Sequence, residues 1–145
     1  EGKTVGVNIE KNQPNGEKIK IIADLMEENK KEKFIKLINP ITEIIKKNNV
    51  TKITSNYGYI INNYSKFKLD DNVNIYNNKK QFVLKTEELS GMFDTGDMYT
   101  NSPVKIKIRN SKIQGSSLSL KNYGEYIKVV GKAKLTIDWY ENKKK

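Results

Sequence analysis

Strict alternation of apolar and polar residues is the feature that most constrains the fold of this chain. It is clearest over residues 82–108, where two alternating runs flank Asp94-Thr95-Gly96. A period of two places successive side chains on opposite faces of a β-strand. Asp-Thr-Gly between two such runs is typical of a turn, and Gly96 is free to adopt a positive φ. The stretch therefore predicts a long hairpin with one apolar and one solvated face.

The alternation repeats along the chain with a period near 31 residues. Equivalent late-strand positions, spaced by 31, 32 and 31 residues, are Ala23, Thr54, Thr86 and Ser117. Such a period holds two strands and two turns, and units of this size bury their apolar faces only by stacking. About ten antiparallel strands and no confident helix predict an all-β fold. Nothing in the pattern closes the sheet, so we expect exposed edge strands at both ends.

The pattern also sets the strand boundaries, and at one place it leaves them open. Pro40 interrupts residues 34–47, which favours an edge strand, a bulge or two strands that meet there, with a helix as the competing prediction. The charged run at 27–33 is predicted to be a loop. Residues 51–61 are predicted to form one strand, and the almost faultless alternation at 127–139 predicts the final strand.

The composition limits the chemistry that this chain can perform. A length of 145 residues suits one domain, predicted over 1–140, with a charged tail at 141–145 that we expect to be disordered. The absence of cysteine and histidine removes disulfides, thiolate metal sites and the commonest general base. No apolar run reaches the length of about 18 residues that a membrane-spanning helix needs. Because the chain starts at Glu1 rather than methionine, we expect that a targeting or anchoring segment has been removed.

A positive charge excess favours anionic partners. The net charge is +10, with 26 lysines and a single arginine, Arg109. Without the bidentate guanidinium group, readout of base edges is disfavoured, so nucleic acid is not the expected partner. The alternative is a basic β-domain that binds nucleic acid or acidic glycan through lysines and scattered stacking tyrosines. Its candidate residues are Lys105, Lys107, Lys128, Lys132, Lys134, Tyr57, Tyr59, Tyr64, Tyr76 and Tyr99.

One motif suggests an enzyme. Phe93-Asp94-Thr95-Gly96 matches the hydrophobic-Asp-Thr-Gly signature of aspartic proteases, which need two carboxylates that share a proton. Here Asp97 follows the motif and adds a charge where that signature has a small residue. The adjacent carboxylates in Glu87-Glu88 and Asp70-Asp71 point to opposite faces of a strand and cannot easily converge. We therefore expect a turn at this motif, no catalytic residues, no metal site, no cofactor and no enzymatic activity.

An apolar lining is the more informative constellation. Alternation places one set of side chains on a shared interior face, which is either an ordinary dry core or a groove left unfilled. The pattern alone does not separate the two. The lining residues are Leu25, Ile41, Ile53, Phe67, Leu69, Val73, Ile75, Phe82, Leu84, Met98, Val104, Ile106, Ile113, Val129, Leu135 and Ile137.

The two ends of the unclosed sheet are candidate interaction sites. An unpaired strand presents free backbone N–H and C=O groups to which another chain can add a strand. At the N-terminal end the expected edge residues are Val5, Val7 and Ile9. At the C-terminal end they are Ile127, Val129, Ala133, Leu135 and Ile137.

The chain resembles the periplasmic domain of LptC, within the wider OstA-like family of lipopolysaccharide export proteins. Five motifs in order carry the resemblance, and Thr95–Val104 is the most specific of them. Departures are Asp71-Asn72-Val73, where a glycine is common before the valine, and Ala133 in place of a valine. The motifs are Asn15-Gly16 with residues 19–24, Leu37-Ile38-Asn39-Pro40-Ile41, Leu84-Lys85-Thr86-Glu87-Glu88-Leu89, Thr95-Gly96-Asp97-Met98-Tyr99-Thr100-Asn101-Ser102-Pro103-Val104 and residues 124–133.

The resemblance implies a fold, a ligand and partners. The fold is an open β-jelly roll in the periplasm, anchored to the inner membrane by an N-terminal helix that this chain lacks. The ligand is lipopolysaccharide, whose acyl chains would occupy the apolar lining. The lipid would arrive from the transporter of LptB, LptF and LptG, with LptF and LptG at the N-terminal edge, and leave to LptA at the C-terminal edge. A soluble bridge protein similar to LptA is the alternative within the family.

Overall fold

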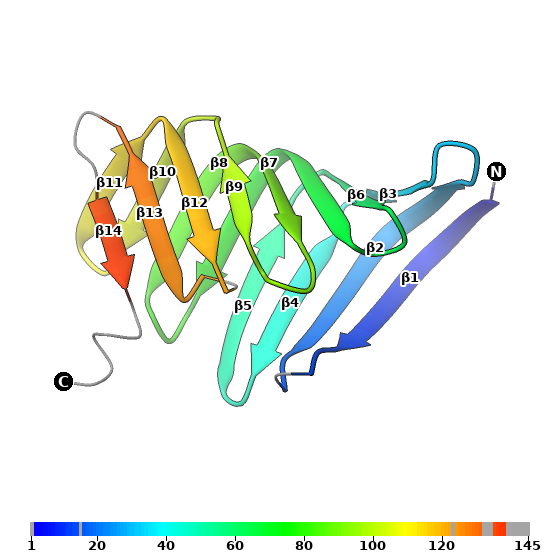
Figure 1. The fold of residues 1–145 in the computed structure, drawn as a ribbon, viewed down its shortest axis with the longest axis horizontal. Coiled ribbons are helices and arrows are strands. Elements are labelled where there is room, and N and C mark those ends of the chain that lie inside the picture. The colour runs from blue at the N-terminus through cyan, green and yellow to red at the C-terminus, as the bar shows by residue number, and fades with distance from the viewer. Residues whose placement is uncertain (1, 15, 123, 132–134, 139–145) are drawn as a thin grey trace.

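The computed structural model describes residues 2–14, 16–122, 124–131 and 135–138. In these ranges the chain forms fourteen strands and no helix, and every strand pair is antiparallel (Figure 1). The all-β prediction is confirmed. The strands are β1 (Gly2–Asn12), β2 (Lys18–Asn29), β3 (Phe34–Ile38), β4 (Ile41–Lys46), β5 (Asn49–Thr54), β6 (Tyr57–Ile61), β7 (Lys66–Asn77), β8 (Phe82–Met92), β9 (Met98–Thr100), β10 (Val104–Ile108), β11 (Ser111–Gly115), β12 (Ser117–Lys121), β13 (Tyr126–Val130) and β14 (Leu135–Asp138).

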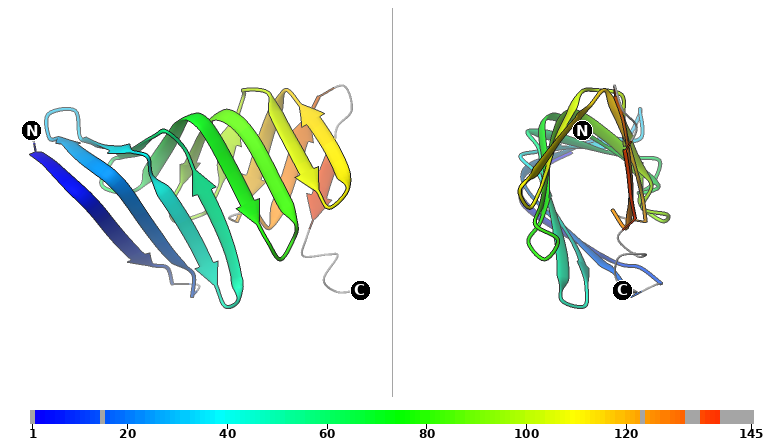
Figure 2. Two further views of the ribbon diagram at one scale, coloured as in Figure 1. Left: turned by 180° about the vertical axis from the view of Figure 1, so that it is seen from behind. Right: turned by 90° about the vertical axis from the view of Figure 1, so that its left-hand side faces the viewer.

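One continuous sheet folds over into two walls. Wall A consists of β4, β5, β10 and β11 with the adjoining halves of β2, β7 and β8. Wall B consists of β3, β6, β9, β12, β13 and β14 with the other halves of the same three long strands. Strand β1 pairs along the whole of β2. The view down the long axis shows the walls facing each other without forming a closed barrel (Figure 2).

Polar residues mark the fold line between the walls. We call Asp24, Asn39, Asn56 and Asp71 the corner row, because each lies where a strand passes from one wall to the other. Asn39 has a φ of 52° and Asp71 a φ of 70°, values that asparagine and aspartate tolerate better than most residues. The amide Nδ2 of Asn39 donates to Asp24 Oδ2 over 2.9 Å, and that of Asn56 donates to Asp71 Oδ2 over 2.8 Å. These bonds tie neighbouring strands together at the bend.

The corners explain why the strand count exceeds the expected ten. Residues 34–47 form β3 and β4, which meet at Pro40, so the two-strand option is confirmed and the helix is wrong. The single strand predicted over 51–61 is wrong, because Ser55 and Asn56 separate β5 from β6. The loop predicted over 27–33 is too long, since β2 continues to Asn29 and pairs with β1 and β3.

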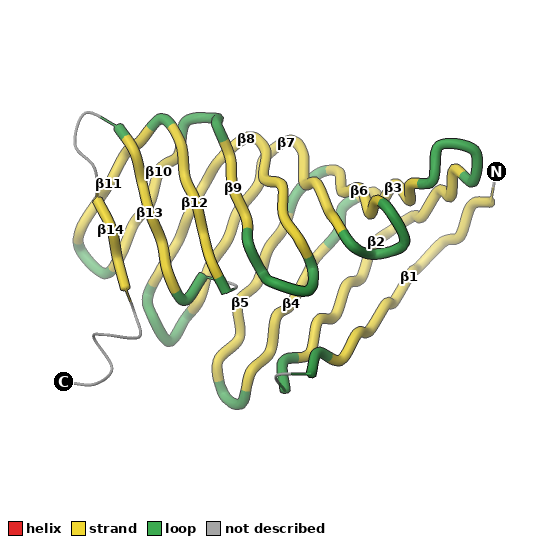
Figure 3. The backbone as a smooth tube through the Cα atoms, in the orientation of Figure 1, coloured by secondary structure: helices red, strands yellow, loops and turns green. Residues whose placement is uncertain are grey.

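The hairpin over residues 82–108 is confirmed. Strand β8 pairs with β9 near the turn and with β10 farther away, and residues 101–103 interrupt the returning strand (Figure 3). The register changes by one residue across this interruption, from Ser90 opposite Tyr99 to Leu84 opposite Ile106. The break is the corner of this strand, so one hairpin contributes to both walls.

The final strand predicted over 127–139 is wrong. Residues 126–130 form β13, which pairs with β12 on one side and with β14 on the other. The alternation belongs to a β-hairpin rather than to one strand, because β13 and β14 pair antiparallel. The edge position at this end of wall B therefore belongs to β14.

Candidate functional site

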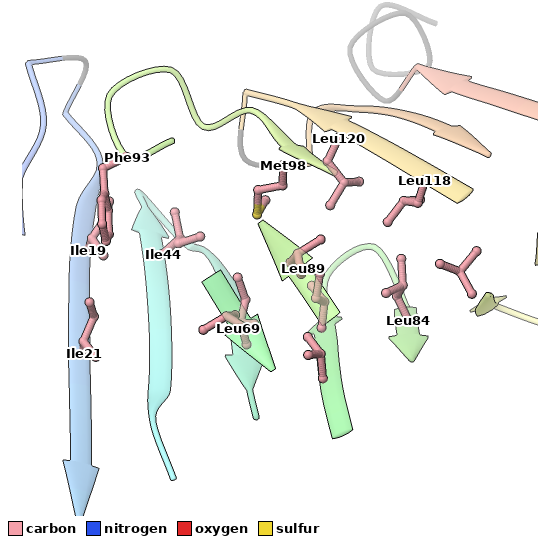
Figure 4. Packing of buried hydrophobic residues seen from close by; sticks show 14 of the residues in the cluster. Ile19, Ile21, Ile44, Leu69, Leu84, Leu89, Phe93, Met98, Leu118 and Leu120 are labelled. Atoms are coloured by element: carbon pink, nitrogen blue, oxygen red, sulfur yellow. The ribbon is translucent and has the colours of Figure 1, made fainter. Parts of the chain in front are cut away.

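The candidate site is the apolar interior between the walls. Buried hydrophobic side chains from β1 to β13 form one contiguous cluster (Figure 4). Twelve of the sixteen lining residues predicted from sequence belong to this cluster or pack against it. They are Ile53, Leu69, Val73, Ile75, Phe82, Leu84, Met98, Val104, Ile106 and Val129, with Phe67 and Ile113 at its margin.

Two predicted lining residues are misplaced. Ile41 pairs with Ile22, which is 40% exposed, whereas the next residue, Thr42, lines the interior. Leu25 is half-buried outside the cluster, and Met26 takes the inward position. Both errors follow a corner, where the extra residue shifts inward positions from odd to even numbers. The side chains of Leu135 and Ile137 lie outside the described residues.

The same shift accounts for some of the interior residues that the predicted lining omits. On β3 and β4 the inward set passes from Leu37 to Ile44 across Asn39, and on β8 it passes from Leu84 to Leu89. A sequence signal for the shifts from β2 to β7 exists in the polar residues that recur every 15 to 17 positions in the corner row. The missed interior residues are Ile19, Ile21, Ala23, Leu37, Ile44, Ile60, Leu89, Phe93, Leu118 and Leu120.

The interior is filled by side chains. A cavity of ≈ 30 Å³ lies among Ile44, Ile60, Leu69 and Phe93, and one of ≈ 20 Å³ lies beside Phe82. Such volumes hold about one or two water molecules and no acyl chain. Of the two readings left open by the sequence, the dry core describes this conformation. An acyl chain fits between the walls only if they separate or if side chains move aside.

A wider hollow lies at the N-terminal end of the interior. Its volume is ≈ 320 Å³, and Met26, Ile35 and Ile60 form its apolar part. The rim carries both signs of charge, with Glu28 near the end of β2 and Lys30 and Lys33 in the turn that joins β2 and β3. The remaining residues of the hollow are Glu28, Asn29, Lys30, Lys33, Phe34, Asn63 and Tyr64.

Side-chain contacts join the walls on the side opposite the corners. The amide Nε2 of Gln13, in the β1–β2 turn, donates to the backbone oxygen of Phe93 over 2.8 Å. The Lys11 ammonium lies 5.3 Å from the centre of the Phe93 ring and 3.5 Å from the backbone oxygen of Tyr64. We call Lys11, Gln13 and Phe93 the latch. It spans 80 residues of sequence between Gln13 and Phe93.

Lysine side chains on the outer face of the sheet are exposed to the solvent. Lys105 and Lys107 are exposed on the outer face of β10, and Lys132 and Lys134 lie outside the described residues. Glu10 Oε1 lies 2.6 Å from Lys18 Nζ, and this hydrogen bond and charge lower the pKa of Glu10.

Two of the tyrosines proposed for base stacking are already engaged by lysine. Lys36 Nζ is 5.2 Å from the ring centre of Tyr57, and Lys52 Nζ is 5.7 Å from that of Tyr76. The outer face therefore offers single lysine–tyrosine pairs rather than a row of stacking platforms, and no observation on it favours the nucleic-acid alternative.

The Asp-Thr-Gly motif is a turn, as predicted. Asp94 is exposed and its Oδ1 accepts a hydrogen bond from the Thr95 backbone over 3.0 Å. Gly96 has a φ of 73° and donates its N–H to the backbone oxygen of Met92 over 3.0 Å. Within the described ranges no three acidic residues cluster where they could hold a metal ion.

The two ends of the sheet differ from the expected edges in one respect. Among the described residues, strand β1 pairs only with β2, and along it Val5 is 81% exposed while Val7 is buried and Ile9 packs against the core. At the other end Ile127 and Val129 lie in β13, which is paired on both sides, so they are not edge residues. Leu135 and Ile137 lie in β14, and Ala133 lies outside the described residues.

The fold and the interior define a class of protein: an open, jelly-roll-like β-domain with an apolar interior and unpaired edges. The family model for lipopolysaccharide-assembly, LptC-related proteins matches residues 5–138. The chain belongs to the LptC family and is a lipopolysaccharide transport protein, and the domain of this family is periplasmic. No curated protein matches the sequence. The described residues include no helix long and apolar enough to cross a membrane.

Proposed function

We propose that this domain holds the acyl chains of lipopolysaccharide between its walls while the lipid passes from the inner-membrane transporter to LptA. The observation that carries the proposal is the continuity of the apolar cluster from β1 to β13. Apolar surface excluded from water is the largest favourable term available for binding an acyl chain. A path that extends from one sheet edge to the other also suits transfer in one direction, rather than storage.

The edges supply the proposed partner contacts. Strand β1 would accept the periplasmic domains of LptF and LptG, and β14 would accept LptA, in both cases by antiparallel strand addition. Strand addition aligns the inner faces of two sheets, so the apolar interior continues into the partner. An N-terminal membrane anchor and a single domain over 1–140 complete the proposal. The LptC family match supports this assignment over a soluble LptA-like bridge.

The domain performs no chemical step in this proposal. The family is a transport and bridge family rather than an enzyme family. The carboxylate of Asp94 in the Asp-Thr-Gly turn accepts a hydrogen bond from the Thr95 backbone, which supports a structural role for this motif.

A photocrosslinking experiment tests the lipid position. A benzoyl-phenylalanine at Val104 or Ile106, 1% and 2% exposed, places the reactive group between the walls. The matched positions Lys105 and Lys107 alternate with them on the same strand and face outward. We expect ultraviolet light to crosslink lipopolysaccharide at the first pair and not at the second. Equal labelling of both faces would overturn the proposal.

A further inference from the structure

An acyl chain needs a way into the filled interior, and the structure restricts where that way lies. On the corner side, long strands β2, β7 and β8 run continuously from wall to wall. Separation there would break backbone hydrogen bonds. On the opposite side, the end of β1 and the β1–β2 turn contact wall B through the side chains of the latch. We call this side, opposite the corner row, the mouth. It can open without loss of sheet pairing.

The N-terminal hollow leads to the interior at this mouth. Ile60 lines both the hollow of ≈ 320 Å³ and the core cavity of ≈ 30 Å³, so the two spaces adjoin at this side chain. Tyr64, which accepts the hydrogen bond from Lys11, also lines the hollow. The latch therefore stands beside the hollow, and the two features belong to one opening.

Phe93 occupies the space that an entering chain would need. Its side chain is 4% exposed, although it belongs to the turn between β8 and β9 rather than to a strand. The ring lies beside Ile19 of β2 and packs on Phe67 with 5.0 Å between ring centres (Figure 4). It also lines the core cavity. An apolar side chain on a turn can leave such a site with little change in the walls.

We infer that lipid enters at the N-terminal hollow and reaches the interior past Ile60, where an acyl chain displaces the side chain of Phe93. This inference rests on the proposed function and adds the entrance and the group that the lipid displaces. The ligand class is an acyl chain with an anionic head group. Lys30 and Lys33 at the rim attract the anion, Glu28 lowers the local positive charge, and Lys11 becomes available to the head group when it leaves the Phe93 ring.

Crosslinking the mouth tests the route. The chain contains no cysteine, so Gln13→Cys with Asp94→Cys gives one defined thiol pair on the two turns of the latch. A short bis-methanethiosulfonate reagent joins the thiols and is removed by reduction. The control pair Asn48→Cys with Asn78→Cys joins two turns that flank one hollow on wall A. The binding probe is cis-parinaric acid, an acyl chain whose fluorescence rises in apolar surroundings.

The crosslinked latch should take up the probe at least tenfold more slowly than the same protein after reduction, and the crosslinked control should not change. If the crosslinked latch takes up the probe as fast as the protein whose crosslink has been removed, the proposed entrance is wrong, although the parent protein still binds lipid. A parent protein that does not bind the probe would overturn the proposed function and this inference with it.

Gln13→Ala keeps the chain free of cysteine and should speed uptake severalfold, whereas the exposed matched variant Gln114→Ala should not.

Charge reversal tests the hollow separately. Lys30→Glu with Lys33→Glu should weaken binding of cis-parinaric acid by at least fivefold and leave its neutral methyl ester unaffected. Lys105→Glu with Lys107→Glu changes the net charge of the protein equally but lies on the outer face of β10. Equal weakening by the two pairs would show that only net charge matters and would remove the hollow from the route.

Discussion

At the scale of single residues, the corner row decides which side chains reach the interior. Each corner lets a strand bend without losing its neighbours, because side-chain amides and carboxylates bridge adjacent strands where the ladder is interrupted. Asn39 shows the requirement most clearly, since it combines a positive φ with a hydrogen bond to Asp24. Asparagine is among the few residues that meet both demands.

We expect Asn39→Ala to lower the free energy of unfolding by about 2 kcal/mol. About 1 kcal/mol comes from the lost hydrogen bond, and about 1 kcal/mol more from an alanine Cβ in the left-handed region. Asn39→Gly loses only the hydrogen bond and should cost about 1 kcal/mol. Urea denaturation gives both values, and the exposed Asn8→Ala serves as control, with a change within about 0.5 kcal/mol. If alanine costs no more than glycine, the backbone at Asn39 carries no strain.

Residue-level reading of the sequence succeeded between corners and failed across them. Within a strand, alternation correctly placed Val104, Ile106 and Leu84 in the core, because the period of two is a property of the extended backbone. Alternation alone does not reveal an inserted residue. Ile41 was therefore predicted to point inward, whereas Thr42 lines the interior. The polar corner residues are visible in the sequence, but their consequence depends on the bend that the folded sheet imposes.

At the scale of elements, the run over 127–139 shows a second limit. Two strands of a hairpin that face the same core give the same alternation as one long strand. Only a turn residue separates the cases, and Gly131 is a weak signal when lysines continue the pattern around it. The pairing of β13 with β14 moves the free edge from Ile127 to β14, and with it the expected LptA contact.

Two proline substitutions on β14 test this edge. Successive backbone N–H groups of a strand point to opposite sides, so one of Leu135→Pro and Thr136→Pro removes an N–H that faces β13 and the other removes one that faces outward. We expect the outward variant to keep the parent stability in thermal denaturation and to lose most of its capture of LptA. The inward variant should lose stability by several degrees in melting temperature. If neither proline reduces capture when the protein is folded, the bridge does not use β14.

At the scale of the whole molecule, charge and apolar surface are separated into outside and inside. The walls turn the apolar faces of all long strands inward, while lysines such as Lys105 and Lys107 alternate outward. The sequence established this separation and the unclosed ends. It did not show how completely the interior is filled, because a pattern of apolar positions is the same for a groove and for a core. That distinction depends on wall spacing, which is a property of the packed molecule.

This separation predicts that ionic strength acts on the association of lipid and not on its retention. A net charge of +10 creates a long-range attraction for anionic lipid. Its reach falls from about 30 Å at 0.01 M salt to about 3 Å at 1 M. In the proposed function, apolar contacts hold the acyl chain between the walls, and this screening does not weaken them. We therefore expect the association rate of lipopolysaccharide to fall about tenfold over this salt range in stopped-flow experiments, with the dissociation rate changed less than twofold.

The methyl ester of cis-parinaric acid carries no charge and should associate at one rate throughout. A dissociation rate that rises as steeply as the association rate falls would mean that the lysines, and not the interior, hold the lipid.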